Sequence, residues 1–161
     1  MLLTSPAFKH SEPIPRKFTC EGGDINPELT VQNLPQGVKS LALLMDDPDA
    51  RLPDALSRQA IGGQAPGGTF THWLVWNIDP AAAFIKEESK PPRSVEGVNS
   101  GATVGYMGPC PPPGKPHRYF FKAYALDAML PLTTGATRQE FEAALAGHVL
   151  GTAELMGTYE R

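Results

Sequence analysis

A histidine and a tyrosine that follow a proline-rich loop are the residues of this chain best placed to do chemistry. His117 and Tyr119 stand two positions apart at the start of an aromatic-rich run, so in a strand their side chains point to the same face. The preceding loop, residues 105–116, contains five prolines and three glycines, which exclude a helix or a central strand and make a rigid wall. We expect a small polar ligand to meet its spare backbone donors, which are the N–H groups of Gly108, Cys110 and Gly114.

Polar residues also mark the ends of two other predicted strands. Asp47 and Asp49 follow an apolar run, and His72 precedes the next one. Each has a plain structural alternative, because Asp47-Pro48-Asp49 is a good turn, His72 suits a sheet edge, and His117 suits an exposed surface. Their joint occurrence is the stronger signal, since strand ends meet at one rim of a two-sheet fold.

This set of side chains suits an anion. A carboxylate favours the charged form of a neighbouring histidine, so Asp47 would keep His72 or His117 charged and give a phosphate a charge-assisted partner. The Tyr119 hydroxyl and loop N–H groups would bind the remaining oxygens. Alternatively, an aspartate accepts hydrogen bonds from an ammonium group on the ligand, which would suit an ethanolamine-like head group.

Two other classes of site use the same residues. Cys110, His117 and Asp47 imitate a thiol hydrolase triad, but Cys110 lies between prolines, where no helix N-terminus activates a thiolate. Asp47, Asp49, His72 and His117 could ligate zinc, yet the usual His-x-x-x-His spacing does not occur. We therefore expect no enzyme, no metal and no cofactor.

The sequence predicts a mostly β fold to position these residues, because 17 prolines and 16 glycines divide the chain into short segments. One helix is expected after Thr137, which caps it together with Glu140 in a capping box, and Gly147 ends it. The expected strands are Glu28–Gln32, Ser40–Asp46, His72–Ile78, Arg118–Leu126 and the tail Ala153–Tyr159.

The composition of the 161 residues is that of one ordinary globular domain, residues 1–161. A net charge of −3 and the lack of a basic run argue against a nucleic-acid partner. No apolar segment reaches the ~20 residues of a membrane span, and the N-terminus does not resemble a leader, so we expect a cytoplasmic protein without integral membrane association. The connection Arg51–Thr69 is longer than a plain turn, a length typical of functional or mobile loops.

Three motifs together resemble the phosphatidylethanolamine-binding protein family, and most closely its bacterial, Raf-kinase-inhibitor-like branch. They are Asp47-Pro-Asp-Ala50, His72-Trp-Leu-Val-Trp-Asn-Ile78, and Gly108-Pro-Cys-Pro-Pro112 followed by His117-Arg-Tyr119. The resemblance extends from Ser5 to the terminal Gly-Thr-Tyr. It implies a two-sheet antiparallel β fold with a C-terminal helix and one small anion pocket at the strand ends, which holds phosphate or phosphoryl head groups.

The function that this resemblance implies is non-enzymatic binding of a phosphate-bearing small molecule or phospholipid head group, with regulation or inhibition of a kinase or protease as an extension. A protein target and a homodimer stay open, because the sequence contains no interface signature. The implied pocket residues are Asp47, Asp49, His72, Gly108, Pro109, Pro111, His117 and Tyr119, with Cys110 on the rim.

The only cysteines are Cys20 and Cys110, too few for a disulfide framework or a zinc cage. A reducing cytosol favours two free thiols. Cys20 lies in a glycine-rich turn that leads to an early strand, and in the family that the chain resembles the counterpart of this strand runs close to the pocket mouth. The two cysteines could then come within the ~4.4–6.8 Å Cα separation of a disulfide, so redox-dependent pairing is the alternative.

Overall fold

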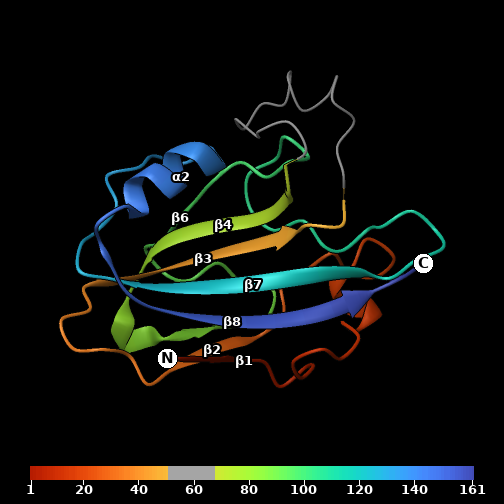
Figure 1. Ribbon diagram of the computed structural model, residues 1–161, viewed down its shortest axis with the longest axis horizontal. Coiled ribbons are helices and arrows are strands. Elements are labelled where there is room, and N and C mark those ends of the chain that lie inside the picture. Colours follow the sequence, from red (N-terminus) through yellow and green to blue (C-terminus); the bar gives the residue numbers. More distant parts are fainter. Residues whose placement is uncertain (51–67) are drawn as a thin grey trace.

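A computed structural model describes residues 1–50 and 68–161 and has two antiparallel sheets with one helix (Figure 1). Nearly all of the predicted connection Arg51–Thr69 lies outside the described residues. The larger sheet has the order β6 (Val95–Glu96), β4 (Phe70–Ile78), β3 (Ser40–Asp47), β7 (His117–Leu126) and β8 (Val149–Tyr159). The smaller sheet has the order β1 (Leu2–Thr4), β2 (Leu29–Gln32) and β5 (Phe84–Ile85).

The helix α2 (Arg138–Leu145) covers one face of the larger sheet, and the smaller sheet covers the other (Figure 1). Two single-turn 3₁₀ helices, η1 (Arg16–Phe18) and η2 (Pro80–Ala82), lie in the connections. The mostly β prediction with a C-terminal helix is confirmed. No helix within the described residues is long and apolar enough to cross a membrane.

The central strand β3 is buried along its whole length because both of its faces are covered. Leu43 and Met45 pack into the core shared with the smaller sheet, whereas Leu44 packs into the core beneath α2. This alternation continues to the end of the strand. Asp46 therefore lies on the α2 side and Asp47 lies on the side of the smaller sheet.

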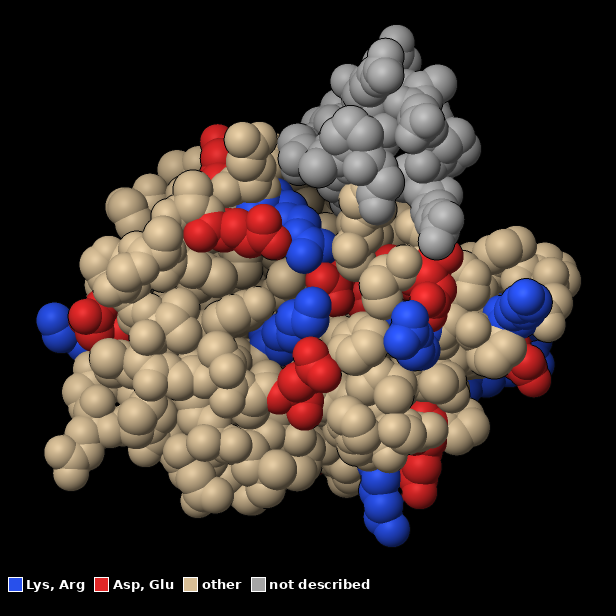
Figure 2. Space-filling view, viewed as in Figure 1, with Lys and Arg blue, Asp and Glu red and all other residues tan. Residues whose placement is uncertain are grey.

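The α2 side of the large sheet holds a charge network rather than a basic patch. One carboxylate oxygen of Asp46 lies 3.0 Å from Lys122 Nζ and 3.0 Å from Arg138 Nη2. On the face drawn in Figure 2, basic side chains lie beside acidic ones instead of gathering in one area. Such a face differs from the basic surfaces that bind nucleic acids.

The predicted strands agree with the observed ones where the sequence pattern is long. Both residues of the capping box, Thr137 and Glu140, adopt the expected reciprocal hydrogen bonds, and the helix ends before Gly147, whose φ is 82°. β8 begins at Val149 rather than at the predicted Ala153. The prediction began too late because the first half of this strand is largely exposed and shows no apolar alternation. The strands β1, β5 and β6 were not predicted, because two or three residues are too few to show a pattern.

Candidate functional site

A cavity of about 620 Å³ opens where β3 ends and where β4 and β7 begin. These ends meet because β3 runs antiparallel to both neighbours, which pairs Asp47 with Phe70 and Asp46 with Phe120. Of the predicted site residues all but Pro109 line the cavity: Asp47, Asp49, His72, Gly108, Cys110, Pro111, His117 and Tyr119. The lining that the sequence did not indicate is largely apolar and comprises Ala50, Phe70, Met107 and Pro112.

Asp47 joins a turn to a histidine. Its Oδ1 accepts hydrogen bonds from the backbone N–H groups of Asp49, at 2.8 Å, and Ala50, at 3.0 Å. Its Oδ2 lies 2.7 Å from Nδ1 of His117; the Asp47 side chain is almost fully buried and the His117 side chain is 13% exposed. One oxygen of this carboxylate therefore stabilises the turn, and the other contacts one of the two predicted site histidines.

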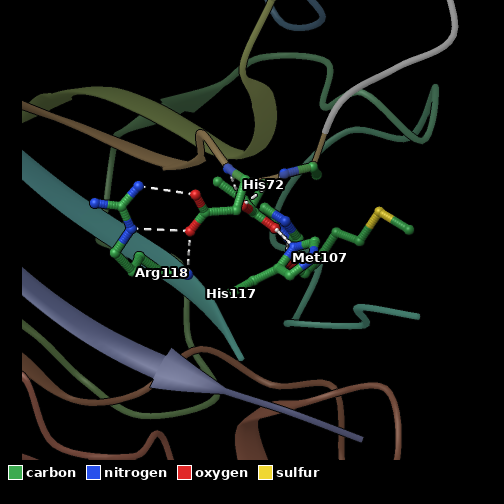
Figure 3. A network of polar contacts seen from close by, with 7 residues as sticks. His72, Met107, His117 and Arg118 are labelled. Carbon is green, nitrogen blue, oxygen red and sulfur yellow. Dashed lines mark hydrogen bonds and ion pairs between the residues drawn. The ribbon is translucent and has the colours of Figure 1, made fainter. Parts of the chain in front are cut away.

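Asp49 faces a different partner, which the sequence did not indicate. Arg118 holds its carboxylate with Nε at 2.9 Å from Oδ2 and Nη2 at 2.8 Å from Oδ1, and the Arg118 backbone N–H also donates to Oδ2 (Figure 3). These hydrogen bonds lower the pKa of Asp49 to about 2. Arg118 lies between the predicted site residues His117 and Tyr119 in β7. This position is the only sequence feature that indicated a role for Arg118 at the site.

His72 differs from the expectation for a histidine near a carboxylate. Its Nδ1 lies 2.7 Å from the backbone oxygen of Met107 (Figure 3). Its ring packs edge-on against Tyr119 at a centroid distance of 5.2 Å. Burial lowers the pKa of His72, although Asp47 acts in the opposite direction. The expectation that Asp47 keeps His72 charged is wrong, because desolvation outweighs the carboxylate and the direct partner of Asp47 is His117.

Tyr119 supplies a buried hydroxyl to the cavity. Its side chain is fully buried, and its oxygen has no hydrogen-bond partner of good geometry among the described residues. Burial, and then the charge of Asp47, raise the pKa of Tyr119. The hydroxyl therefore stays protonated and is a donor for an oxygen atom brought by a ligand.

The proline-rich wall uses two of its three predicted spare N–H groups within the protein. Gly108 donates to Oδ1 of Asp24 at 2.6 Å, and Gly114 donates to the backbone oxygen of Arg161 at 3.3 Å. The expectation that these two N–H groups are available to a ligand is therefore wrong. The local sequence did not reveal it because both acceptors lie far away along the chain.

A disulfide joins Cys110, in this wall, to Cys20, with a Cα–Cα distance of 5.5 Å. The Cys20 N–H also donates to the backbone oxygen of Pro109 at 3.2 Å, so a hydrogen bond joins the same two loops. The expectation of two free thiols is wrong for this structure. The thiol hydrolase alternative loses its nucleophile as well, since a disulfide-bonded Cys110 has no thiolate.

The metal alternative also finds no support within residues 1–50 and 68–161. No three His, Cys, Asp or Glu side chains of that part are grouped so as to hold a metal ion. The carboxylates of Asp47 and Asp49 are instead directed at His117 and Arg118.

Substitution of Gly108 by alanine should displace the cavity wall. A Cβ atom there would lie 2.4 Å from the backbone oxygen of Phe18 and 2.6 Å from Asp24 Oδ1. We expect Gly108→Ala to lower the free energy of unfolding by about 1–3 kcal/mol, measured by chemical denaturation. Gly151→Ala is the control, because its nearest neighbour is the flexible Met1 side chain. Equal losses in the two variants would contradict the close packing of the wall.

Comparisons with known proteins agree with this fold and its motifs. The family model for phosphatidylethanolamine-binding protein matches residues 4–160. A UPF0098 protein of Pyrococcus horikoshii is 45% identical over 167 residues, which cover 99% of this chain and 77% of that protein. A UPF0098 protein of Chlamydia muridarum is 42% identical over 161 residues, which cover 100% of this chain and 99% of that protein.

Two solved structures are similar over nearly their full lengths. One is a phosphatidylethanolamine-binding protein homologue from Chlamydia trachomatis, with a TM-score of 0.86, 39% identity, and coverage of 99% of this chain and 97% of the other. The second is YbcL of E. coli, described as a member of the mammalian family, with a TM-score of 0.84, 29% identity, and coverage of 99% and 98%. The resemblance seen in the three motifs is confirmed, and the chain belongs to the phosphatidylethanolamine-binding protein family, which makes it a binding-type protein.

Proposed function

We propose that this protein binds the phosphoryl group of a small molecule or of a phospholipid head group in the cavity and leaves it chemically unchanged. The observation that supports this most is the 2.7 Å contact between His117 Nδ1 and Asp47 Oδ2. Because Nδ1–H donates to the carboxylate, Nε2 is the ring atom left for a ligand. A carboxylate partner also stabilises an imidazolium, which offers an anion a charge-assisted hydrogen bond.

The two aspartates of the cavity do not oppose an anion, because each already has partners. Asp47 accepts from two backbone N–H groups and from His117, and Asp49 is paired with Arg118. The same contacts make the alternative in which an aspartate binds a ligand ammonium group less favourable, since each carboxylate already accepts three hydrogen bonds of the roughly four that it can accept. The phosphoryl end of a ligand is the end that fits here.

The cavity is larger than a phosphate ion requires, so an organic group attached to the phosphate has room. Its apolar walls, which include Phe70, Met107 and Pro112, suit such a group. The disulfide supports a non-enzymatic role, because Cys110 bonded to Cys20 cannot be the nucleophile of a thiol hydrolase. Regulation of a kinase or protease would then act through ligand occupancy, which is the property to measure first.

Calorimetric titration with phosphoethanolamine and inorganic phosphate near pH 6 tests the proposal. We expect saturable binding that His117→Ala weakens at least tenfold, because the charge-assisted donor is lost, and that Tyr119→Phe weakens about fivefold. His148→Ala is a matched control, since His148 also contacts a carboxylate, that of Asp127 at 2.8 Å, but on the exposed surface. Absence of binding, or an equal loss in the control, would contradict the proposal.

A cytoplasmic location is part of the proposal on grounds of composition, and the disulfide gives a way to test it. Structural disulfides are typical of oxidising compartments and rare in a reducing cytosol. Rapid alkylation of intact cells followed by mass spectrometry measures whether Cys20 and Cys110 are bonded there. Full oxidation of both would argue for a location outside a reducing cytosol.

A further inference from the structure

Neighbouring groups fix which cavity atoms donate hydrogen bonds and which accept them. His72 differs from His117 and Tyr119, because the ring atom that it leaves free is an acceptor. The backbone oxygen of Met107, 2.7 Å from Nδ1 of His72, can only accept, so Nδ1 must carry the proton. In a neutral ring the other nitrogen, Nε2, is then an acceptor. His72 thus presents an acceptor, whereas Tyr119 and a charged His117 present donors.

The surroundings of His72 favour the neutral form of the ring. Burial lowers the pKa of His72 and outweighs the favourable effect of three carboxylates, those of Asp47 and Asp46 at the end of β3 and of Asp24 in the facing loop. The ring is only 4% exposed and lies between aromatic neighbours, with Phe70 at a centroid distance of 4.8 Å and Tyr119 at 5.2 Å. Protonating it in this setting would place a charge where water is excluded.

We infer that the pocket selects a phosphomonoester in its singly protonated form, whose P–O–H group donates to Nε2 of His72 while its unprotonated oxygens accept from His117 and Tyr119. The inference rests on the proposed function and defines the ligand class. A dianionic phosphate, a phosphodiester and a sulfate ester all lack an acidic proton, so each would set an oxygen lone pair against the lone pair of His72. A buried acceptor without a donor is costly, which makes His72 the residue that discriminates.

The test compares phenyl phosphate with phenyl sulfate, which match in shape and, at pH 5.5, largely in charge. We expect phenyl phosphate to bind at least tenfold more tightly at this pH. The ratio of the two affinities should then fall by up to tenfold per pH unit above about pH 6, where the second ionisation of phosphate removes the proton. Taking the ratio of the two affinities removes any effect of pH on the protein that is common to both ligands.

Substitution of His72 tests whether this residue accepts the hydrogen bond from the P–O–H group of the ligand. His72→Gln, whose amide can turn its NH₂ group toward the ligand, should bring the affinity ratio close to one. His10→Gln should leave the ratio unchanged, because His10 contacts the backbone of Met156 on the exposed surface. If His72→Gln fails to fold, the pH dependence of the ratio in the unaltered protein still decides the matter.

Each outcome separates this inference from the proposal on which it rests. Equal binding of the two esters, sensitive to His117→Ala, would overturn proton selection and leave phosphoryl binding intact. Binding of neither ester would contradict both. Short-chain phosphatidic acid and phosphatidylethanolamine extend the comparison to lipids, since the first is a monoester and the second a diester. We expect the monoester to bind more tightly, and preference for the diester would also overturn the inference.

Discussion

Cys20→Ser and Cys110→Ser are each expected to lower the free energy of unfolding by about 4 to 5 kcal/mol. The bond joins residues 90 positions apart, and opening so long a loop restores much conformational entropy to the unfolded chain. Guanidinium denaturation under non-reducing conditions measures the difference. The loss should also weaken ligand binding, because Cys110 lines the cavity and its wall would no longer be covalently held.

Chemical reduction provides the control for this result. The unaltered protein treated with a thiol reductant should match the two variants in stability, and the variants themselves should not respond to the reductant. These two cysteines are the only ones in the chain, so no other thiol complicates the comparison. Variants as stable as the oxidised protein would show that the bond does not constrain the native fold.

Removal of the Asp47 carboxylate is the second large effect that we expect. Asp47→Ala should lower the free energy of unfolding by about 3 to 5 kcal/mol, since it leaves two backbone N–H groups and buried His117 without their acceptor. Thermal and chemical denaturation measure this loss. Binding of phenyl phosphate should fall at least tenfold in the folded fraction, because His117 loses the group that orients it.

Asp49→Ala is the matched control, two positions along the same segment. Its ion pair with Arg118 is exposed, so its loss should cost less than about 1 kcal/mol. With a pKa lowered to about 2, Asp49 adds a small stability that is present above its ordinary value of 3.8 and is lost as the pH falls toward 2. If Asp49→Ala were as damaging as Asp47→Ala, the assignment of separate roles would be wrong.

The features that could be predicted from the sequence depend on neighbouring residues. The capping box of Thr137 and Glu140 joins residues three apart, and the buried run that forms β3 needs only its own apolar side chains. The family motifs are also short and contiguous. For this reason the mostly β class, the helix, five of the strands and the meeting of strand ends could all be predicted from the sequence.

Only the tertiary structure decided which site residues contact one another and which charge state each of them favours. Asp47 could have paired with either histidine, and packing brought it to His117, 70 positions away, while burial lowered the pKa of His72 and so favoured its neutral form. In the same way Asp24 occupies the N–H of Gly108 across 84 positions, and Cys20 reaches Cys110 across 90. Residue types and the ends of strands are local properties, so they can be predicted from the sequence. Desolvation and long-range partners depend on how two sheets and a loop close on one another, and no local pattern encodes that.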